Sequence, residues 1–217
     1  MIKPILFNTE MVRAILDGRK TVTRRVVKHD VDAVLNSPYH KEHPGVSDKQ
    51  IISKLCMPPY QPGDMLYVRE TWGISNLVYD DKIVYIVYKA SENEKEEGCR
   101  AVRLPDDKFE KLYDSMAENS PDWRPSIHMT KEAARIWLKV KDVRVERLQC
   151  MSWDDICNEG IISDSNVRDD FSFRMLQNKF RNLWNYTIKK SDLDRYGWDA
   201  NPWVWVIEFE RCEKPEL

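Results

Sequence analysis

The feature that most constrains the fold is a series of short strand-like segments without long helices between them. "MLYVRE" (65–70) alternates between apolar and polar residues, as a half-buried strand does, and "KIVYIVYK" (82–89) is apolar on both faces, as a central strand is. "PWVWVIEFERC" (202–212) reads as a further strand near the C-terminus. Since no βαβ rhythm is present, we predict a mainly β, α+β fold: a small barrel or curled sheet with peripheral helices.

Three segments have helical patterns. "NTEMVRAILDG" predicts a short helix in which Thr9 caps the N-terminus and Gly18 closes the C-terminus. In "SWDDICNEGI", Ser152 and Asp155 have the spacing of a capping box. Apolar residues at helical spacing predict a longer amphipathic helix from about 171 to 185.

Between these elements lie strands and two insertions. "KTVTRRVV" (20–27) predicts a strand, and residues 133–148 predict either one long strand or two. Residues 29–55 lack a pattern, and residues 91–121 are charged and irregular, so we interpret both as insertions in a single domain spanning 1–217. In the second insertion, four apolar residues have the spacing of one short helix: Phe109, Leu112, Tyr113 and Met116.

Composition excludes several classes of protein. The net charge of −2 argues against wholesale nucleic-acid binding, so any such contact must be a local patch. Five cysteines without a CxxC pair indicate free, mostly buried thiols in a reducing compartment. No apolar run has the length of a membrane span and the N-terminus lacks a signal peptide, so we expect a cytoplasmic protein.

Familiar catalytic motifs are absent from the sequence. It contains no GxGxxG, GxxxxGK[ST], HExxH or GxSxG pattern, and the His40/His43 pair has no obvious third ligand. We therefore expect neither a metal nor one of the usual cofactors. A hydrolase built on this chain would depend on Lys, Thr, Glu or Tyr.

A basic turn, "LDGRKTVTRR" (16–25), is the strongest local feature. Between residues 13 and 28 the chain carries one acid, Asp17, and six basic residues: Arg13, Arg19, Lys20, Arg24, Arg25 and Lys28. Two interpretations are open. The turn is either a solvated loop and strand, or a site for an anionic or carbonyl-bearing group.

The basic turn resembles the G-x-K-x-x-[E/T]-x-R signature of ASCH domains, with matches at Gly18, Lys20, Thr23 and Arg25. Further segments resemble, in order, the larger ASCH-domain proteins common in phages and prophages: "PGDMLYVRETW", "WRPSIHM", "RVERLQ", "NEGI", "FRNLWN" and "WDANPWVWVIEF". The resemblance covers most of the chain outside the two insertions. It implies a PUA-like β-barrel.

The resemblance also implies two activities. PUA-like barrels often bind RNA, whereas small bacterial ASCH proteins similar to this one in the basic turn are amidohydrolases that deacetylate N(4)-acetylcytidine. Their catalytic set, carried over by this resemblance, falls on Lys20, Thr23 and Glu159 in "NEGI". We assign Thr23 as nucleophile, Lys20 as base and Glu159 as acid or orienting group.

This chemistry has one physical requirement. A threonine hydroxyl needs a neighbouring base, and lysine is a base only when burial or nearby cations lower its pKa. On a regular strand, Lys20 and Thr23 point to opposite faces. The two side chains therefore cooperate only if the chain after Gly18 turns irregularly before the strand begins.

Other residues are candidates for substrate binding: Arg19, Arg25, Tyr67, Arg69, Arg124, Ser126 and His128. The eight tryptophans are interpreted as core residues, or in part as a stacking platform for a nucleobase. Two functions remain open. The chain is an amidohydrolase acting on an acylated cytosine-type base, or a module that binds RNA or a modified nucleotide without catalysis.

Overall fold

The computed structural model describes residues 1–91, 99–114, 123–165 and 167–215. Its contacts divide the chain into two compact units. Unit 1 comprises residues 1–17, 65–138 and 211–217, and unit 2 comprises residues 18–64 and 139–210. The expected single domain remains a prediction, and each unit is described separately.

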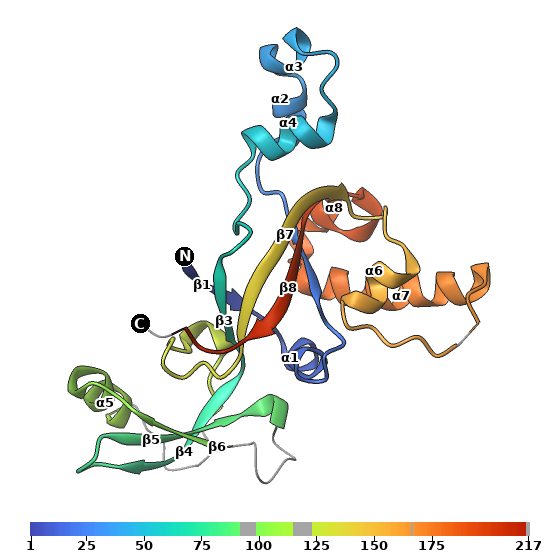
Figure 1. The fold of residues 1–217 in the computed structure, drawn as a ribbon. Coiled ribbons are helices and arrows are strands. Elements are labelled where there is room, and N and C mark those ends of the chain that lie inside the picture. The colour runs from blue at the N-terminus through green and yellow to red at the C-terminus, as the bar shows by residue number, and fades with distance from the viewer. Residues whose placement is uncertain (92–98, 115–122, 166, 216–217) are drawn as a thin grey trace. The chain divides into compact units, whose positions relative to one another are not determined.

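Unit 2 contains three neighbouring strands, in the order β7 (Trp137–Arg147), β8 (Trp203–Cys212) and β2 (Val22–Val26), seen in Figure 1. β2 is antiparallel to β8, with Thr23 opposite Ile207, and is the end strand of its sheet. β7 continues through Asp142, so the segment for which one or two strands were predicted forms a single strand.

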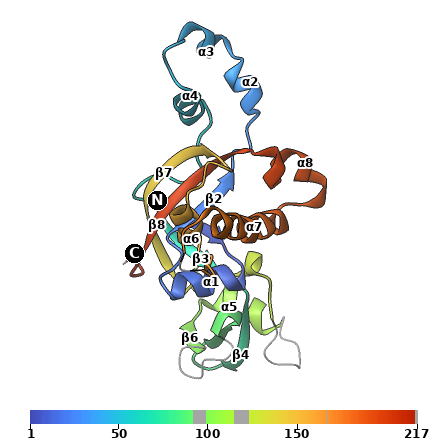
Figure 2. The ribbon, with the colours of Figure 1, turned by 90° about the vertical axis from the view of Figure 1, so that its right-hand side faces the viewer.

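Helices α6 (Trp153–Asn158) and α7 (Asp170–Thr187) belong to the same unit and contact each other (Figure 2). The predicted capping box of α6 is confirmed, because Ser152 and Asp155 exchange both hydrogen bonds. The core of unit 2 joins the two helices to β2 and β8 through Val22, Ile156, Leu176, Phe180, Trp184, Val204 and Val206. A short helix, α8 (Leu193–Tyr196), follows α7.

The first insertion is folded, which corrects the expectation of a segment without pattern. It contains α2 (Val31–Leu35), α3 (Pro38–Glu42) and α4 (Asp48–Leu55), and α2 contacts α4. Each helix begins at a side-chain cap, Asp30, Ser37 or Ser47 respectively. α2 and α3 have five residues each and bury none of them, so they show no hydrophobic period, whereas α4 has eight residues and buries Ile51 and Ile52.

Unit 1 begins with β1 (Ile2–Leu6), which pairs in parallel with β3 (Met65–Arg69). Between them in sequence lies the predicted first helix, α1 (Thr9–Leu16). Its cap differs from the prediction, since Asn8 rather than Thr9 accepts the hydrogen bond from the backbone N–H of Met11. Asn8 is one residue earlier and has the extended backbone that a cap requires.

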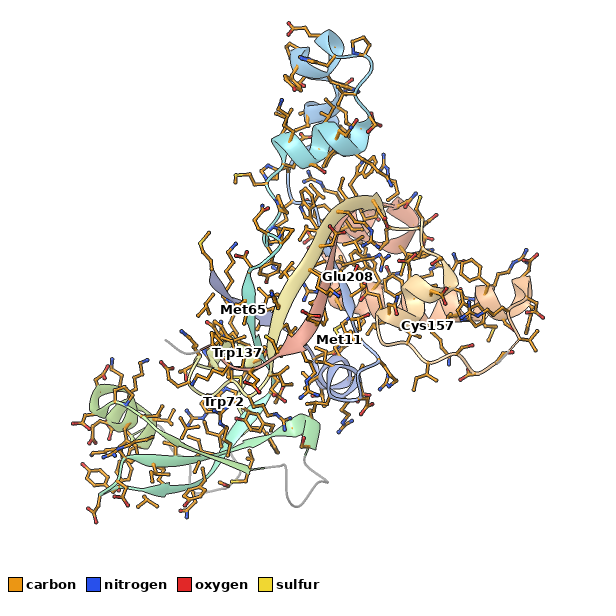
Figure 3. The ribbon with its side chains drawn as sticks, viewed as in Figure 1. Met11, Met65, Trp72, Trp137, Cys157 and Glu208 are labelled. Atoms are coloured by element: carbon orange, nitrogen blue, oxygen red, sulfur yellow. The ribbon has the colours of Figure 1, made fainter. Side chains whose placement is uncertain are left out.

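A second sheet in unit 1 has the antiparallel order β4 (Trp72–Val78), β5 (Ile83–Tyr88) and β6 (Cys99–Arg103). The predicted central position of β5 is confirmed, whereas β4 and β6 were not predicted. Helix α5 (Asp106–Tyr113) contains Phe109, Leu112 and Tyr113 of the expected short helix, and Met116 lies outside the described residues. Trp72, labelled in Figure 3, is part of the buried core beneath this sheet.

The expected mixture of sheet and helices is confirmed, while the closed barrel is not, because the strand order within each unit is open. All five cysteines are free, but only Cys56 is buried, which corrects the expectation of mostly buried thiols. Among the described residues, no helix has the length and apolar character to cross a membrane.

Candidate functional site

The basic turn lies against the C-terminal end of α6 within unit 2. Lys20 forms an isolated antiparallel bridge with Glu159, and the Thr21 N–H donates to the Asn158 carbonyl at 2.9 Å. The Arg19 guanidinium donates to the Gly160 carbonyl at 2.6 Å. The turn therefore binds the "NEGI" segment, about 140 residues later in the sequence, through backbone and side chains together.

Lys20 is a buried cation with a nearby acid. Its side chain has no exposed surface, and its ammonium lies 2.6 Å from Oε2 of Glu159, which is itself buried. The same nitrogen donates to the carbonyls of Glu159 and Val22 at 3.0 and 2.9 Å. These three acceptors match the three hydrogens of an ammonium. The interpretation of Lys20 as a solvated loop residue is therefore wrong.

The Val22 carbonyl is available to Lys20 because of the strand register. The Thr21 carbonyl accepts from Phe209 N–H, and Val27 N–H donates to the Trp203 carbonyl, so odd-numbered residues of this segment bond to β8. Backbone groups of even-numbered residues then point away from β8. Because β2 is the end strand, the carbonyl of Val22 lies on its free side, where Lys20 occupies it.

Arg24 is a second cation on the same carboxylate. Its Nη1 donates to Oε1 of Glu159 at 3.1 Å and its Nη2 to Oδ1 of Asp155 at 3.2 Å. The Nε of Arg24 is buried and has no hydrogen-bond partner among the described residues. Glu159 thus holds Lys20 with one oxygen and Arg24 with the other.

The electrostatics of this cluster favour loss of a proton from Lys20. Burial lowers the pKa of the Lys20 ammonium below its ordinary value; Glu159 opposes this, while the charges of Arg25 and Arg24 lower the pKa further. Burial also lowers the pKa of Arg25, against the stabilising influence of Tyr60 and Glu159. Desolvation and like charges are the two effects that convert a lysine into a base.

Thr23 is buried in the regular part of β2, opposite Ile207. Consecutive strand residues point to opposite faces, so Thr23 faces away from its neighbours Val22 and Arg24. Lys20 itself precedes the regular strand, and its ammonium lies against the oxygen of the peptide group that joins Val22 to Thr23. The lysine nitrogen therefore lies beside the backbone of Thr23. No hydrogen bond of the Thr23 hydroxyl is recorded among the described residues, and this side chain faces away from the face on which Lys20 and Arg24 meet Glu159.

The remaining sequence-predicted residues, apart from Arg19 and Arg25, belong to unit 1. Tyr67 lies on β3, 6.0 Å from the ring of Trp137, and Arg69 ends the same strand. The guanidinium of Arg124 lies 5.6 Å from the ring of Trp72, to which Arg124 is also joined by a backbone bridge. Ser126 and His128 form a single 3₁₀ turn, Ser126–His128.

Sequence reasoning missed two members of the cluster. It treated Arg24 only as one of several nearby cations, and it assigned Asp155 only to the cap of α6, although Asp155 also pairs with Arg24. The spacing of Lys20 and Arg24, four residues apart and therefore on one strand face, is the signal that was available.

Among the described residues, no group of three or more His, Cys, Asp or Glu side chains is arranged to hold a metal ion.

No protein-family model and no curated protein matches the chain. A solved structure of an ASCH domain from Lactobacillus crispatus aligns over 97% of this chain and 79% of its own, at 11% identity and a TM-score of 0.37. In this comparison the chain is similar to an ASCH domain, the family whose signature its basic turn resembles.

Proposed function

We propose that the chain is a metal-independent amidohydrolase that removes an acyl group from a cytosine-type base, such as that of N(4)-acetylcytidine. Lys20 and Glu159 act as the proton-transferring pair and Thr23 as the nucleophile. A PUA-like barrel carrying this pocket is part of the proposal.

The observation that supports it most is the buried contact between Lys20 and Glu159. The two residues are 139 positions apart in the sequence, and the family resemblance assigns both to one catalytic set. Their nitrogen and oxygen lie 2.6 Å apart, within the distance at which a proton passes directly between donor and acceptor.

The proposed reaction proceeds in two steps. The reaction requires the Thr23 hydroxyl to turn toward Lys20. Neutral Lys20 then takes the hydroxyl proton while the oxygen attacks the acyl carbonyl, and collapse of the tetrahedral intermediate breaks the C–N bond. The leaving amine takes a proton from the Lys20–Glu159 pair. Water then hydrolyses the threonine ester to give acetate and the free hydroxyl, with the pair again accepting and returning the proton.

Arg24 and Arg25 contribute positive charge in a buried environment. A developing oxyanion is stabilised most strongly where cations and donors are fixed and water is excluded. The same charges disfavour the protonated form of Lys20. The same two arginines would thus keep Lys20 neutral as a base and stabilise the negative charge of the transition state.

The alternative is a binding module that recognises RNA or a modified nucleotide. One observation favours it: all three ammonium hydrogens of Lys20 have acceptors, so the lysine is held as a structural cation in this state. A protein that only binds a nucleotide or RNA needs a site of suitable shape and charge, and its lysine can remain protonated.

Hydrolysis of N(4)-acetylcytidine, followed by its absorbance, tests the proposal. The variants are Lys20→Ala, Thr23→Ala and Glu159→Gln, with Lys28→Ala, an exposed lysine just beyond β2, as matched control. We expect turnover in the parent and control and at least a hundredfold loss in each of the three variants. An inert parent that binds the nucleoside supports the binding module, and a fully active Thr23→Ala variant contradicts the nucleophile assignment.

A further inference from the structure

One face of α7 carries large side chains that stay exposed. Phe171 and Tyr186 are 73% and 84% exposed, and Met175 is 49% exposed. Together with the exposed Asn178 and Asn182, they follow one another at intervals of three or four residues, so they form a single stripe along the 18-residue helix. We call these five residues the outer stripe. The other side of α7 belongs to the core of unit 2 (Figure 2).

A small cavity lies beside the first turns of α7. It has a volume of about 170 Å³, and its walls include Phe171, Met175 and Leu176 of the helix and the preceding residues 163–165. Since a cavity of about 150 Å³ holds a benzene ring, this one has room for one aromatic side chain. At its rim, one carboxylate oxygen of Asp164 holds the Lys179 ammonium at 2.6 Å, and the other oxygen can accept a hydrogen bond from a phenol hydroxyl.

The outer stripe is arranged symmetrically about the midpoint of α7, which lies between Asn178 and the next residue. Phe171 lies as far before this midpoint as Tyr186 lies after it, and Met175 and Asn182 form a second pair of this kind. In two antiparallel helices related by a two-fold axis at their midpoints, each residue meets the residue at the mirrored position of the other copy. A second copy in this register therefore brings its Tyr186 to Phe171 and the cavity, at both ends of the interface.

The charges at the two ends of α7 fit the same register. Asp169 and Asp170 are exposed at its start, and Lys189 and Lys190 are exposed just after its end. No ion pair of these four side chains is recorded in the part of the chain that the structure describes. Antiparallel packing places the acidic end of each helix beside the basic end of the other, whereas parallel packing would place like charges together.

We propose that the outer stripe binds a second copy of this chain, antiparallel and about a two-fold axis, with the Tyr186 ring of each copy in the cavity of the other. The helix is about 27 Å long. An interface confined to one face of it lies at the small end of the range for protein pairs, so the dimer is weak. The inference does not depend on the activity of the Lys20 site.

Sedimentation equilibrium of the full chain, at concentrations from about 1 μM to about 1 mM, tests the proposal. Tyr186→Ala removes the ring that enters the cavity, and Tyr113→Ala, at a tyrosine of α5 that is 48% exposed, is the matched control. We expect a monomer–dimer equilibrium in the parent and the control. In Tyr186→Ala we expect a dimer at least about tenfold weaker, because the substitution removes the ring from both ends of the interface.

An exchange of charges tests the antiparallel register. The Asp170→Lys variant and the double variant Lys189→Glu with Lys190→Glu each place like charges at both ends of the dimer, so we expect neither to associate with itself. Mixed in equal amounts, the two variants have opposite charges at both ends again, and we expect a heterodimer.

Three results overturn the proposal. A parent that stays monomeric over the whole range means that something other than a second copy binds this face. A Tyr186→Ala variant that dimerises as tightly as Tyr113→Ala places the contact elsewhere on the molecule. A mixture of the two charge variants that stays monomeric excludes the antiparallel register.

Discussion

Each unit of this protein buries a glutamate beside a cation, and the two arrangements differ in how many partners the charged groups share. In unit 1, the fork of Arg135 meets both oxygens of Glu70, each at 3.0 Å. Its remaining nitrogen donates to Ser91 at 2.9 Å, and the guanidinium lies 4.1 Å from the ring centre of Tyr88. One acid meets one base with matched geometry.

In unit 2, Glu159 instead meets two cations, Lys20 and Arg24, and Arg24 also pairs with Asp155. The Nε of Arg24 has no hydrogen-bond partner in the part of the chain that the structure describes. A one-to-one bidentate pair stabilises a fold and leaves nothing for a ligand. Arg24 is shared between Glu159 and Asp155, so Glu159 is one member of a branched network and does not form a closed pair with Lys20. The comparison distinguishes a structural ion pair from one suited to chemistry.

The largest effect is expected from Arg135→Met, because Glu70 then loses the cation that it meets among the described residues while remaining buried. An uncompensated buried charge destabilises by about 3–5 kcal/mol. Urea unfolding of the variant measures this loss, with Arg103→Met on the exposed side of β6 as control. A loss no greater than that of the control contradicts the structural role.

Lys20→Met is expected to cost less stability, about 1–2 kcal/mol, because Glu159 keeps Arg24. The same urea titration compares it with Lys139→Met, an exposed lysine of β7. If Lys20→Met destabilises as much as Arg135→Met, the two glutamates are equivalent and the distinction between them is wrong.

Gly18→Ala tests how the turn before Lys20 contributes. Gly18 has φ of +73°, a conformation that a side chain disfavours by about 1 kcal/mol, although the added Cβ meets no atom within 4 Å. Gly45→Ala, which has equal space and no positive φ, is the control for the thermal melts. We expect only the Gly18 variant to lower the melting temperature.

The smallest effects are two opposite slopes of stability against pH. Burial raises the pKa of Glu70, against the opposing influence of Arg135, so the folded state holds that proton to higher pH than the unfolded state. Its contribution to stability therefore falls as pH rises from about 4.3 through the raised folded value. Glu70→Gln is expected to remove this falling slope relative to the parent.

For Lys20 the slope of stability against pH has the opposite sign. Burial lowers its pKa, so the unfolded state binds more protons, and stability rises with pH from the lowered folded value to about 10.4. Lys20→Met is expected to flatten this alkaline rise in urea titrations over the same range. A variant that keeps the full slope shows that another group carries it.

The sequence pattern of a segment was enough to predict those helices and strands that have a clear hydrophobic or capping pattern of their own. β5 is apolar on both faces and lies between two strands, and α6 begins at its capping box. β4 was missed because a register irregularity between Ile74 and Asn76 breaks its alternation. In residues 29–55, α2 and α3 were missed because five residues are too few to show a period. α4 has eight residues and was missed although Ser47 and Gln50 form a capping box at its start.

The site depends on contacts that local pattern does not contain. Lys20 and Glu159 were assigned to one site through a family resemblance. Nothing in the type of either residue predicts that it contacts the other. The bond from Arg24 to Glu159 joins positions 135 apart and follows from how β2 lies against the end of α6. Such long-range contacts are set by tertiary packing. In the sequence, only the alternation of faces along β2 indicates that Arg24 lies near Lys20.

The position of Lys20 on the free side of β2 has a consequence for the solubility of the protein. An end strand with open carbonyls invites pairing with a second chain, and proteins block this with charges and covering loops. Here the ammonium of Lys20 occupies the Val22 carbonyl, and the "NEGI" segment covers the adjacent backbone at Thr21. The residues proposed for catalysis thus also keep one molecule from adding its strand to the next, and selection on activity and selection against aggregation act on the same lysine.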